Sequence, residues 1–70
     1  MIPDRIGNIV IAKDLDNKET CINLDRVDYW KGDSDHSTEV HLFNCNFSIW
    51  IQIDETEFRK YYFKYKKELK

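Results

Sequence analysis

The side chains best suited to metal chemistry lie in one polar segment of the chain. His36 follows Asp33 and Asp35 there, and these residue types bind transition metals. A metal site needs three or four ligands that converge on the ion, whereas near neighbours in one loop are more typical of a solvated turn. We therefore expect no metal site in this segment.

A second group of carboxylates has part of the spacing of a calcium-binding loop. Asp14, Asp16 and Asp25 fall at positions one, three and twelve of such a loop. The central glycine is missing, and Asp25 stands where a bidentate glutamate is needed. We expect no calcium binding, and the sequence indicates no other cofactor.

Nucleophilic catalysis by Cys45 would need a base and a further group that orients the base. His41 is the histidine nearest to Cys45 in the sequence, and it has no obvious acidic partner. No glycine-rich phosphate loop or serine triad signature is present either. A single sheet with one helix seldom encloses a pocket. We therefore expect a protein that is not an enzyme and takes no small-molecule substrate.

The 70 residues are enough for one small domain, residues 1–70, with a thin core. Ten aromatic residues exclude a disordered chain. No apolar run is long enough to span a membrane, and the N-terminus has no stretch of signal-peptide length. These features predict a cytoplasmic protein without membrane contact, in which Cys21 and Cys45 stay free thiols.

Charge is divided unevenly along the chain. Residues 1–57 carry a net charge of −7, and residues 58–70 carry +5. The acidic body disfavours a dedicated binder of duplex DNA, which normally presents a basic surface. Lys60, Lys64 and Lys67 share one side of the predicted helix, so they form either a solvated face or a contact with phosphate or an acidic partner.

Hydrophobic periodicity predicts five strands followed by a helix. The strands are expected at about 8–14, 20–24, 27–31, 38–43 and 47–53. Polar segments rich in Asp, Asn and Ser separate them. The predicted fold class is therefore α+β, a four- or five-stranded antiparallel β-meander with one C-terminal helix packed on one face.

The helix is expected at about 55–68. Asp54 and Glu57 have the spacing of a capping box, and Ile53 can pack on Phe58 as a hydrophobic staple. The apolar stripe of the helix consists of Phe58, Tyr62, Tyr65 and Leu69.

Strand alternation leaves large aromatic side chains on the face of the sheet away from the helix. The expected members of this face are Trp30, His41, Phe43 and Trp50. Contiguous apolar patches mark contact surfaces, and aromatic side chains are their usual anchors. Three interpretations stay open: Ile2, Pro3 and Ile6 cover the patch, it binds protein, or it stacks nucleic-acid bases.

Several short motifs run in order through most of the chain. They are Leu15-Asp16-Asn17, Ile22-Asn23-Leu24-Asp25, Val27-Asp28-Tyr29, Thr38-Glu39-Val40-His41-Leu42, Asn44-Cys45-Asn46, the strand at 49–53 and Asp54-Glu55-Thr56-Glu57. This order resembles the small bacterial FlbD family, which is found among flagellar genes and usually has Asn-Gly at both turns. The resemblance implies a small accessory protein and supplies no catalytic residues.

The sequence as a whole favours a small non-enzymatic interaction module. We expect it to bind a protein partner or itself, as a homodimer or other homo-oligomer, through the aromatic sheet face. The alternative is a nucleic-acid-binding or regulatory protein that uses the basic C-terminal helix.

Overall fold

The computed structural model describes residues 4–33 and 36–69, and within them the fold is α+β with antiparallel strands and a C-terminal helix, as predicted. The elements are β1 (Asp4–Ile6), β2 (Ile9–Lys13), β3 (Glu19–Asn23), the 3-10 turn η1 (Leu24–Arg26), β4 (Val27–Asp33), β5 (Ser37–Leu42), β6 (Ser48–Ile51) and α1 (Glu55–Glu68). The described strands form two three-stranded sheets, ordered β1-β2-β3 and β4-β5-β6. The prediction of one sheet with four or five strands is therefore wrong in strand number and in sheet number.

The first sheet contains a strand that the sequence analysis did not predict. β1 pairs antiparallel with β2 through a tight turn at Gly7, whose positive φ of 60° is a backbone conformation that suits glycine. β1 has only three residues and two of its side chains are exposed, so it lacks the apolar alternation that marks a strand. In the neighbouring pair, Val10 lies opposite Ile22, and both are fully buried.

A single turn of 3-10 helix separates the two sheets. The side chain of Asn23 accepts a hydrogen bond from the backbone N–H of Asp25 at 2.9 Å, which ends β3 and starts η1. The chain then enters β4 in the second sheet. A backbone hydrogen bond also links the two sheets: the N–H of Gln52, just after β6, donates to the carbonyl of Lys13, at the end of β2, at 2.7 Å.

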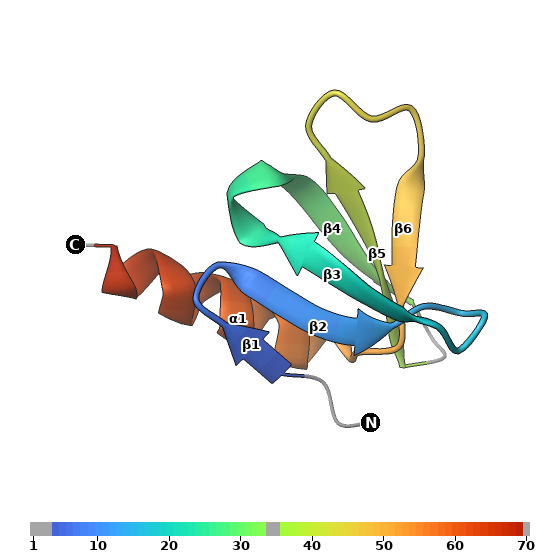
Figure 1. The fold of residues 1–70 in the computed structure, drawn as a ribbon, viewed down its shortest axis with the longest axis horizontal. Helices are drawn as coiled ribbons and strands as arrows, with labels where there is room; N and C mark the ends of the chain where they lie inside the picture. Colours follow the sequence, from blue (N-terminus) through green and yellow to red (C-terminus); the bar gives the residue numbers. More distant parts are fainter. Residues whose placement is uncertain (1–3, 34–35, 70) are drawn as a thin grey trace.

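Both sheets and α1 enclose one core (Figure 1). Its buried side chains are Val10, Ala12, Ile22, Leu24, Val27, Val40, Ile51, Ile53, Phe58 and Tyr65. Of the predicted helix stripe, Phe58 and Tyr65 are buried and Tyr62 packs against the core. Leu69 was predicted to belong to it but is 59% exposed, because it lies past the end of α1 and beyond the sheets.

The predicted capping box does not form at the start of α1. Asp54 is the N-cap residue, but its side chain makes no capping hydrogen bond. Its Oδ1 instead lies 2.7 Å from Nδ1 of His36. The predicted staple residues Ile53 and Phe58 are both buried in the core, so apolar burial rather than the carboxylate pair fixes the start of the helix.

Within residues 4–33 and 36–69, no helix has the length and apolar character that crossing a membrane requires.

Candidate functional site

A β-bulge in β4 decides which aromatic side chains reach the outer surface of the second sheet. Val27 lies opposite Leu42, but the next paired residue is Tyr29, opposite His41, so Asp28 is an extra residue. Such an insertion breaks strict alternation. Val27 and Trp30 therefore both face the core, and Tyr29 faces outward.

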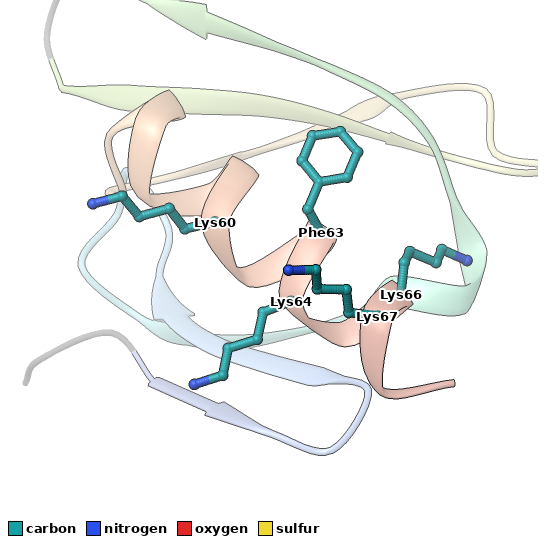
Figure 2. A pocket seen from close by; sticks show the side chains of 5 residues that line it. All are labelled: Lys60, Phe63, Lys64, Lys66 and Lys67. Carbon is teal, nitrogen blue, oxygen red and sulfur yellow. The ribbon is translucent and has the colours of Figure 1, made fainter. Parts of the chain in front are cut away.

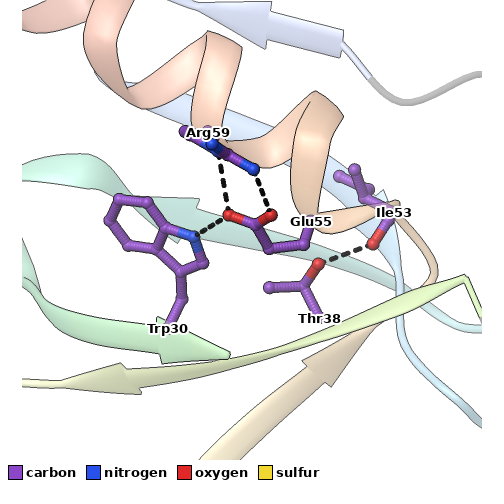
Figure 3. Close-up of polar contacts among 5 residues, drawn as sticks. All are labelled: Trp30, Thr38, Ile53, Glu55 and Arg59. Carbon is purple, nitrogen blue, oxygen red and sulfur yellow. Dashed lines mark hydrogen bonds and ion pairs between the residues drawn. The ribbon is translucent and has the colours of Figure 1, made fainter. Parts of the chain in front are cut away.

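The placement of Trp30 on the outer face, predicted from alternation, is therefore wrong. Its ring packs against α1, with ring centroids 5.3 Å from Phe58 and 4.9 Å from Tyr62. Its indole N–H donates a hydrogen bond to Glu55 Oε2 at 2.9 Å, and Arg59 holds the same carboxylate from the next turn of the helix (Figure 3). Trp30 belongs to the sheet–helix interface, where its polar atom has a partner.

These contacts also act on the charge of Glu55. The hydrogen bond from Trp30, followed by that from Arg59, lowers the pKa of the Glu55 carboxyl below its ordinary value of 4.5. Beside it, the fully buried Thr38 hydroxyl donates to the Ile53 carbonyl at 2.7 Å (Figure 3). The polar groups shown at this interface are thus paired. Among the described residues, the side of the second sheet that faces α1 is covered by the helix and leaves no surface for a partner.

The outer side of the same sheet carries a stacked aromatic pair. The rings of Tyr29 and His41 are nearly parallel, with an angle of 9° between their planes and 4.7 Å between their centroids. Nδ1 of His41 is buried and makes no hydrogen bond among the described residues, and it lies 3.4 Å from Oδ2 of Asp28. The stack and the carboxylate fix the orientation of the imidazole on the surface of the sheet.

Two more aromatic side chains extend this outer surface. Trp50 lies opposite Glu39 in the β5–β6 ladder and is 36% exposed, and Phe43 is 50% exposed. The backbone N–H of Phe43 donates to the Arg26 carbonyl at 2.8 Å, so the ladder continues past the end of β5 and Phe43 shares the side of His41. We call Tyr29, His41, Phe43 and Trp50 the aromatic face.

A hollow lies at one end of the aromatic face. It is lined by Asp14, Leu15, Asp16, Ser48, Ile49 and Trp50. The turn that joins β2 to β3 forms one wall, and the edge strand β6 forms the other. Leu15 is 58% exposed on that wall, so the hollow offers an apolar side chain opposite an indole ring.

Ile6 does not cover the aromatic face. It lies in β1 of the other sheet and is itself 65% exposed. Ile2 and Pro3, the other residues expected to fold over this surface, lie outside the described residues.

The predicted basic residues lie together on the outer side of α1. Lys60, Lys64 and Lys67 line a shallow hollow with Phe63 and Lys66, and all five side chains are exposed (Figure 2). Phe63 and Lys66 were not among the residues singled out for binding, although Phe63 lies next to the predicted lysine stripe.

The polar segment with His36 shows no convergent ligand set. Asp35 lies outside the described residues, and within those described no group of three or more His, Cys, Asp and Glu side chains could hold a metal ion. Nδ1 of His36 lies 2.7 Å from Oδ1 of Asp54, and both side chains are largely exposed. Cys21 and Cys45 are free thiols.

Comparisons with known protein families, curated proteins and solved structures give no significant match to this chain. The resemblance to the FlbD family therefore stays a prediction.

Proposed function

We propose that the chain is a small non-enzymatic module that binds protein, a second copy of itself or a different partner, through the aromatic face. The observation that carries this proposal is the exposure of Tyr29, Phe43 and Trp50 on one side of β4-β5-β6, which no described element covers. Aromatic side chains anchor protein interfaces because they bury a large apolar area at a low cost in side-chain entropy.

The geometry of the aromatic face favours a protein partner over nucleic acid. Asp28 and Glu39 lie on or beside this surface, within a body whose net charge is −7 over residues 1–57. Phosphates would be repelled there, whereas a protein surface can match both the rings and the carboxylates. The stacked Tyr29–His41 pair is already ordered, so little conformational freedom is lost when a partner docks.

The edge of the sheet adds a second means of contact. β6 is the last strand of its sheet; its C-terminal residue Ile51 is bridged to Asp14, while its N-terminal end follows the exposed residue Phe47. An edge strand offers unpaired backbone groups to another chain. A partner that pairs with β6 would lie beside Trp50 and could place a side chain in the hollow next to it.

Sedimentation equilibrium over a wide range of protein concentration tests self-association. We expect the wild type to associate and the double variant Trp50→Asp, Phe43→Ser to stay monomeric but folded, which circular dichroism checks. Leu69→Ser is the matched control, because Leu69 is exposed to a similar degree but lies at the far end of the helix.

Affinity capture with the same three proteins as bait tests a different partner. A specific protein retained by the wild type and by Leu69→Ser, but lost with the double variant, supports the proposal. A wild-type monomer at every concentration, whose captured proteins are the same for all three baits, contradicts it.

A further inference from the structure

The outer side of α1 carries a row of lysines that points away from the body. Lys60, Lys64 and Lys67 follow one another at intervals of four and three residues, which places them along about 10 Å of one helix side. Their side chains extend to the same side in Figure 2, and that of Lys66 extends to the other. We call these three residues the lysine row.

No described carboxylate forms an ion pair with the lysine row. The helix acids that form ion pairs have other partners, since Glu55 pairs with Arg59 and Glu68 with Arg5, at 2.7 and 2.8 Å. None of the ion pairs in the described part of the chain includes a residue of the row. The row is therefore a local concentration of positive charge that is free to meet an anion.

Lys66 differs from the lysine row in its surroundings. Its ammonium group lies 5.3 Å from the ring centroid of Tyr62 and 5.7 Å from that of Tyr65. Its charge also helps to lower the pKa of Asp25, after the larger effect of the hydrogen bond from Tyr65. Lys66 thus contributes to the packing of the helix on the body.

An aromatic ring lies beside the lysine row, and two other rings pack against it. Phe63 is 55% exposed, and its ring centroid lies 6.3 Å from that of Trp30 and 5.6 Å from that of Tyr62, both in edge-to-face geometry. These two contacts restrict the ring while more than half of the residue stays accessible. Phe63 is therefore a fixed apolar platform beside the lysines (Figure 2).

From this arrangement we propose that the outer side of α1 binds a short stretch of single-stranded nucleic acid, with phosphates on the lysine row and one unpaired base on Phe63. A fixed aromatic ring flanked by cations is the combination that such strands use, because every base has a face that stacks and every nucleotide carries a phosphate. This surface is separate from the aromatic face, so the proposal goes beyond the proposed function.

The charges of the body favour single strands over duplex DNA. A duplex keeps its bases stacked away from Phe63 and brings a denser array of phosphates toward a body of net charge −7. An acidic protein segment would satisfy the lysines but gives no reason for the exposed ring among them. The footprint is limited to the length of the lysine row, so binding is weak and strongly dependent on salt.

Fluorescence anisotropy with a fluorescein-labelled fifteen-nucleotide oligothymidine tests the proposal, starting at about 50 mM salt, where contacts with phosphates are strong. We expect binding that weakens as salt is raised, with a slope of about −2 in log affinity against log salt for three phosphate contacts on a single strand. The triple variant Lys60→Gln, Lys64→Gln, Lys67→Gln abolishes that slope. Lys18→Gln, in an exposed turn on another part of the body, is the control and leaves it unchanged.

Two variants of the ring separate stacking from charge. Phe63→Leu keeps an apolar side chain against Trp30 but removes the stacking surface, so we expect about 5- to 100-fold weaker binding with an unchanged salt slope. Phe63→Tyr retains the stacking surface and keeps the wild-type affinity. Circular dichroism of each variant shows whether its fold is intact.

Four results would overturn the proposal. They are absence of binding at about 50 mM salt, binding that the triple lysine variant leaves unchanged, tighter binding to the duplex of the same length, and equal competition by a polyglutamate peptide, which would indicate an acidic protein partner. Trp50→Asp leaves oligonucleotide binding unchanged, so failure here is distinguishable from failure of the aromatic face.

Discussion

The two sides of the β4-β5-β6 sheet place the two tryptophans of this chain in opposite environments. Trp30 lies on the inner side, where its ring packs against Phe58 and Tyr62 and its N–H is bonded to Glu55. Trp50 lies on the outer side and is 36% exposed. Among the described residues it has neither a ring contact nor a side-chain hydrogen bond.

This difference separates what folding explains from what it does not. Burying an aromatic ring stabilises a small domain, and a paired indole N–H removes the cost of burying a polar group. Both reasons apply to Trp30. They apply less fully to Trp50, which is 36% exposed and whose indole N–H has no hydrogen-bond partner among the described residues. The inner side is thus accounted for by stability, while the exposed rings of the outer side are the feature that the proposed protein contact would explain.

Truncating each tryptophan to alanine is the strongest test of this comparison. We expect Trp30→Ala to lower the free energy of unfolding by about 3 kcal/mol, because it leaves a cavity beneath the helix. Trp50→Ala should lower it less, by about 1 kcal/mol, because part of the residue already lies in solvent in the folded chain. Urea denaturation followed by circular dichroism measures both values.

The contrast between the two sides of the sheet is wrong if Trp30→Ala and Trp50→Ala lower the free energy of unfolding by similar amounts. Because a thin core can fail altogether after a loss of this size, Trp30→Phe serves as the milder variant that keeps the aromatic packing. A Trp50→Ala variant that unfolds at a much lower urea concentration than the wild type would show that the outer side also holds the fold together.

Adding a single methyl group at Gly32, on the inner side of the sheet, should also destabilise the fold. A Cβ atom built on Gly32 lies 2.7 Å from the Cβ and 3.1 Å from the Cγ of Glu55, so β4 approaches the first turn of α1 closely. We expect Gly32→Ala to cost about 2 kcal/mol through displacement of the helix start. Thermal denaturation of the variant measures the loss.

Gly7→Ala is the matched control for this prediction. Its added Cβ meets nothing within 4 Å, but the positive φ of 60° at this turn disfavours a side chain. The expected cost is about 1 kcal/mol, which is backbone strain alone. If Gly32→Ala is no more harmful than Gly7→Ala, the contact between β4 and α1 is looser than the structure shows.

The sequence predicted the elements whose patterns are local and strong. The C-terminal helix follows from the spacing of Phe58 and Tyr65 and from the acidic residues before them, and these signals depend on neighbouring positions only. β1 was missed because three residues with two exposed side chains carry no such pattern. The division into two sheets was missed because it falls at the 3-10 turn η1, whose start depends on the hydrogen bond between the Asn23 side chain and the Asp25 backbone N–H.

The candidate site was predicted in part, for a reason that lies in one residue. Alternation placed His41, Phe43 and Trp50 on the side away from the helix, and the structure has them there, with Phe43 and Trp50 exposed and His41 half-buried. It failed for Trp30, since the extra residue Asp28 reverses the alternation in the middle of β4. Nothing in the local sequence marks this bulge, so Tyr29 could not have been chosen over Trp30.

The smallest expected effect concerns the ionisation of Glu55, and it distinguishes the two tryptophans without unfolding the chain. Trp30→Phe keeps a ring against the helix but removes the N–H donor that is the main cause of the lowered Glu55 pKa. We expect the pKa of Glu55 to rise toward its ordinary value of 4.5, though not fully, since Arg59 still bonds to the carboxylate. Carbon NMR titration of the carboxyl group measures this change.

The sign of the matching stability change follows from linkage. A carboxyl whose pKa is lowered by folding adds stability above its ordinary pKa, and that contribution is lost as the pH falls through the lowered value. The free energy of unfolding should therefore depend less steeply on pH below about 4.5 in Trp30→Phe than in the wild type. Trp50→Phe, on the outer side of the sheet, should leave both the titration and the slope unchanged. An unaltered Glu55 titration in Trp30→Phe would mean that the indole N–H is not its partner in solution, and the inner side would then lose the polar pairing that sets it apart from the outer one.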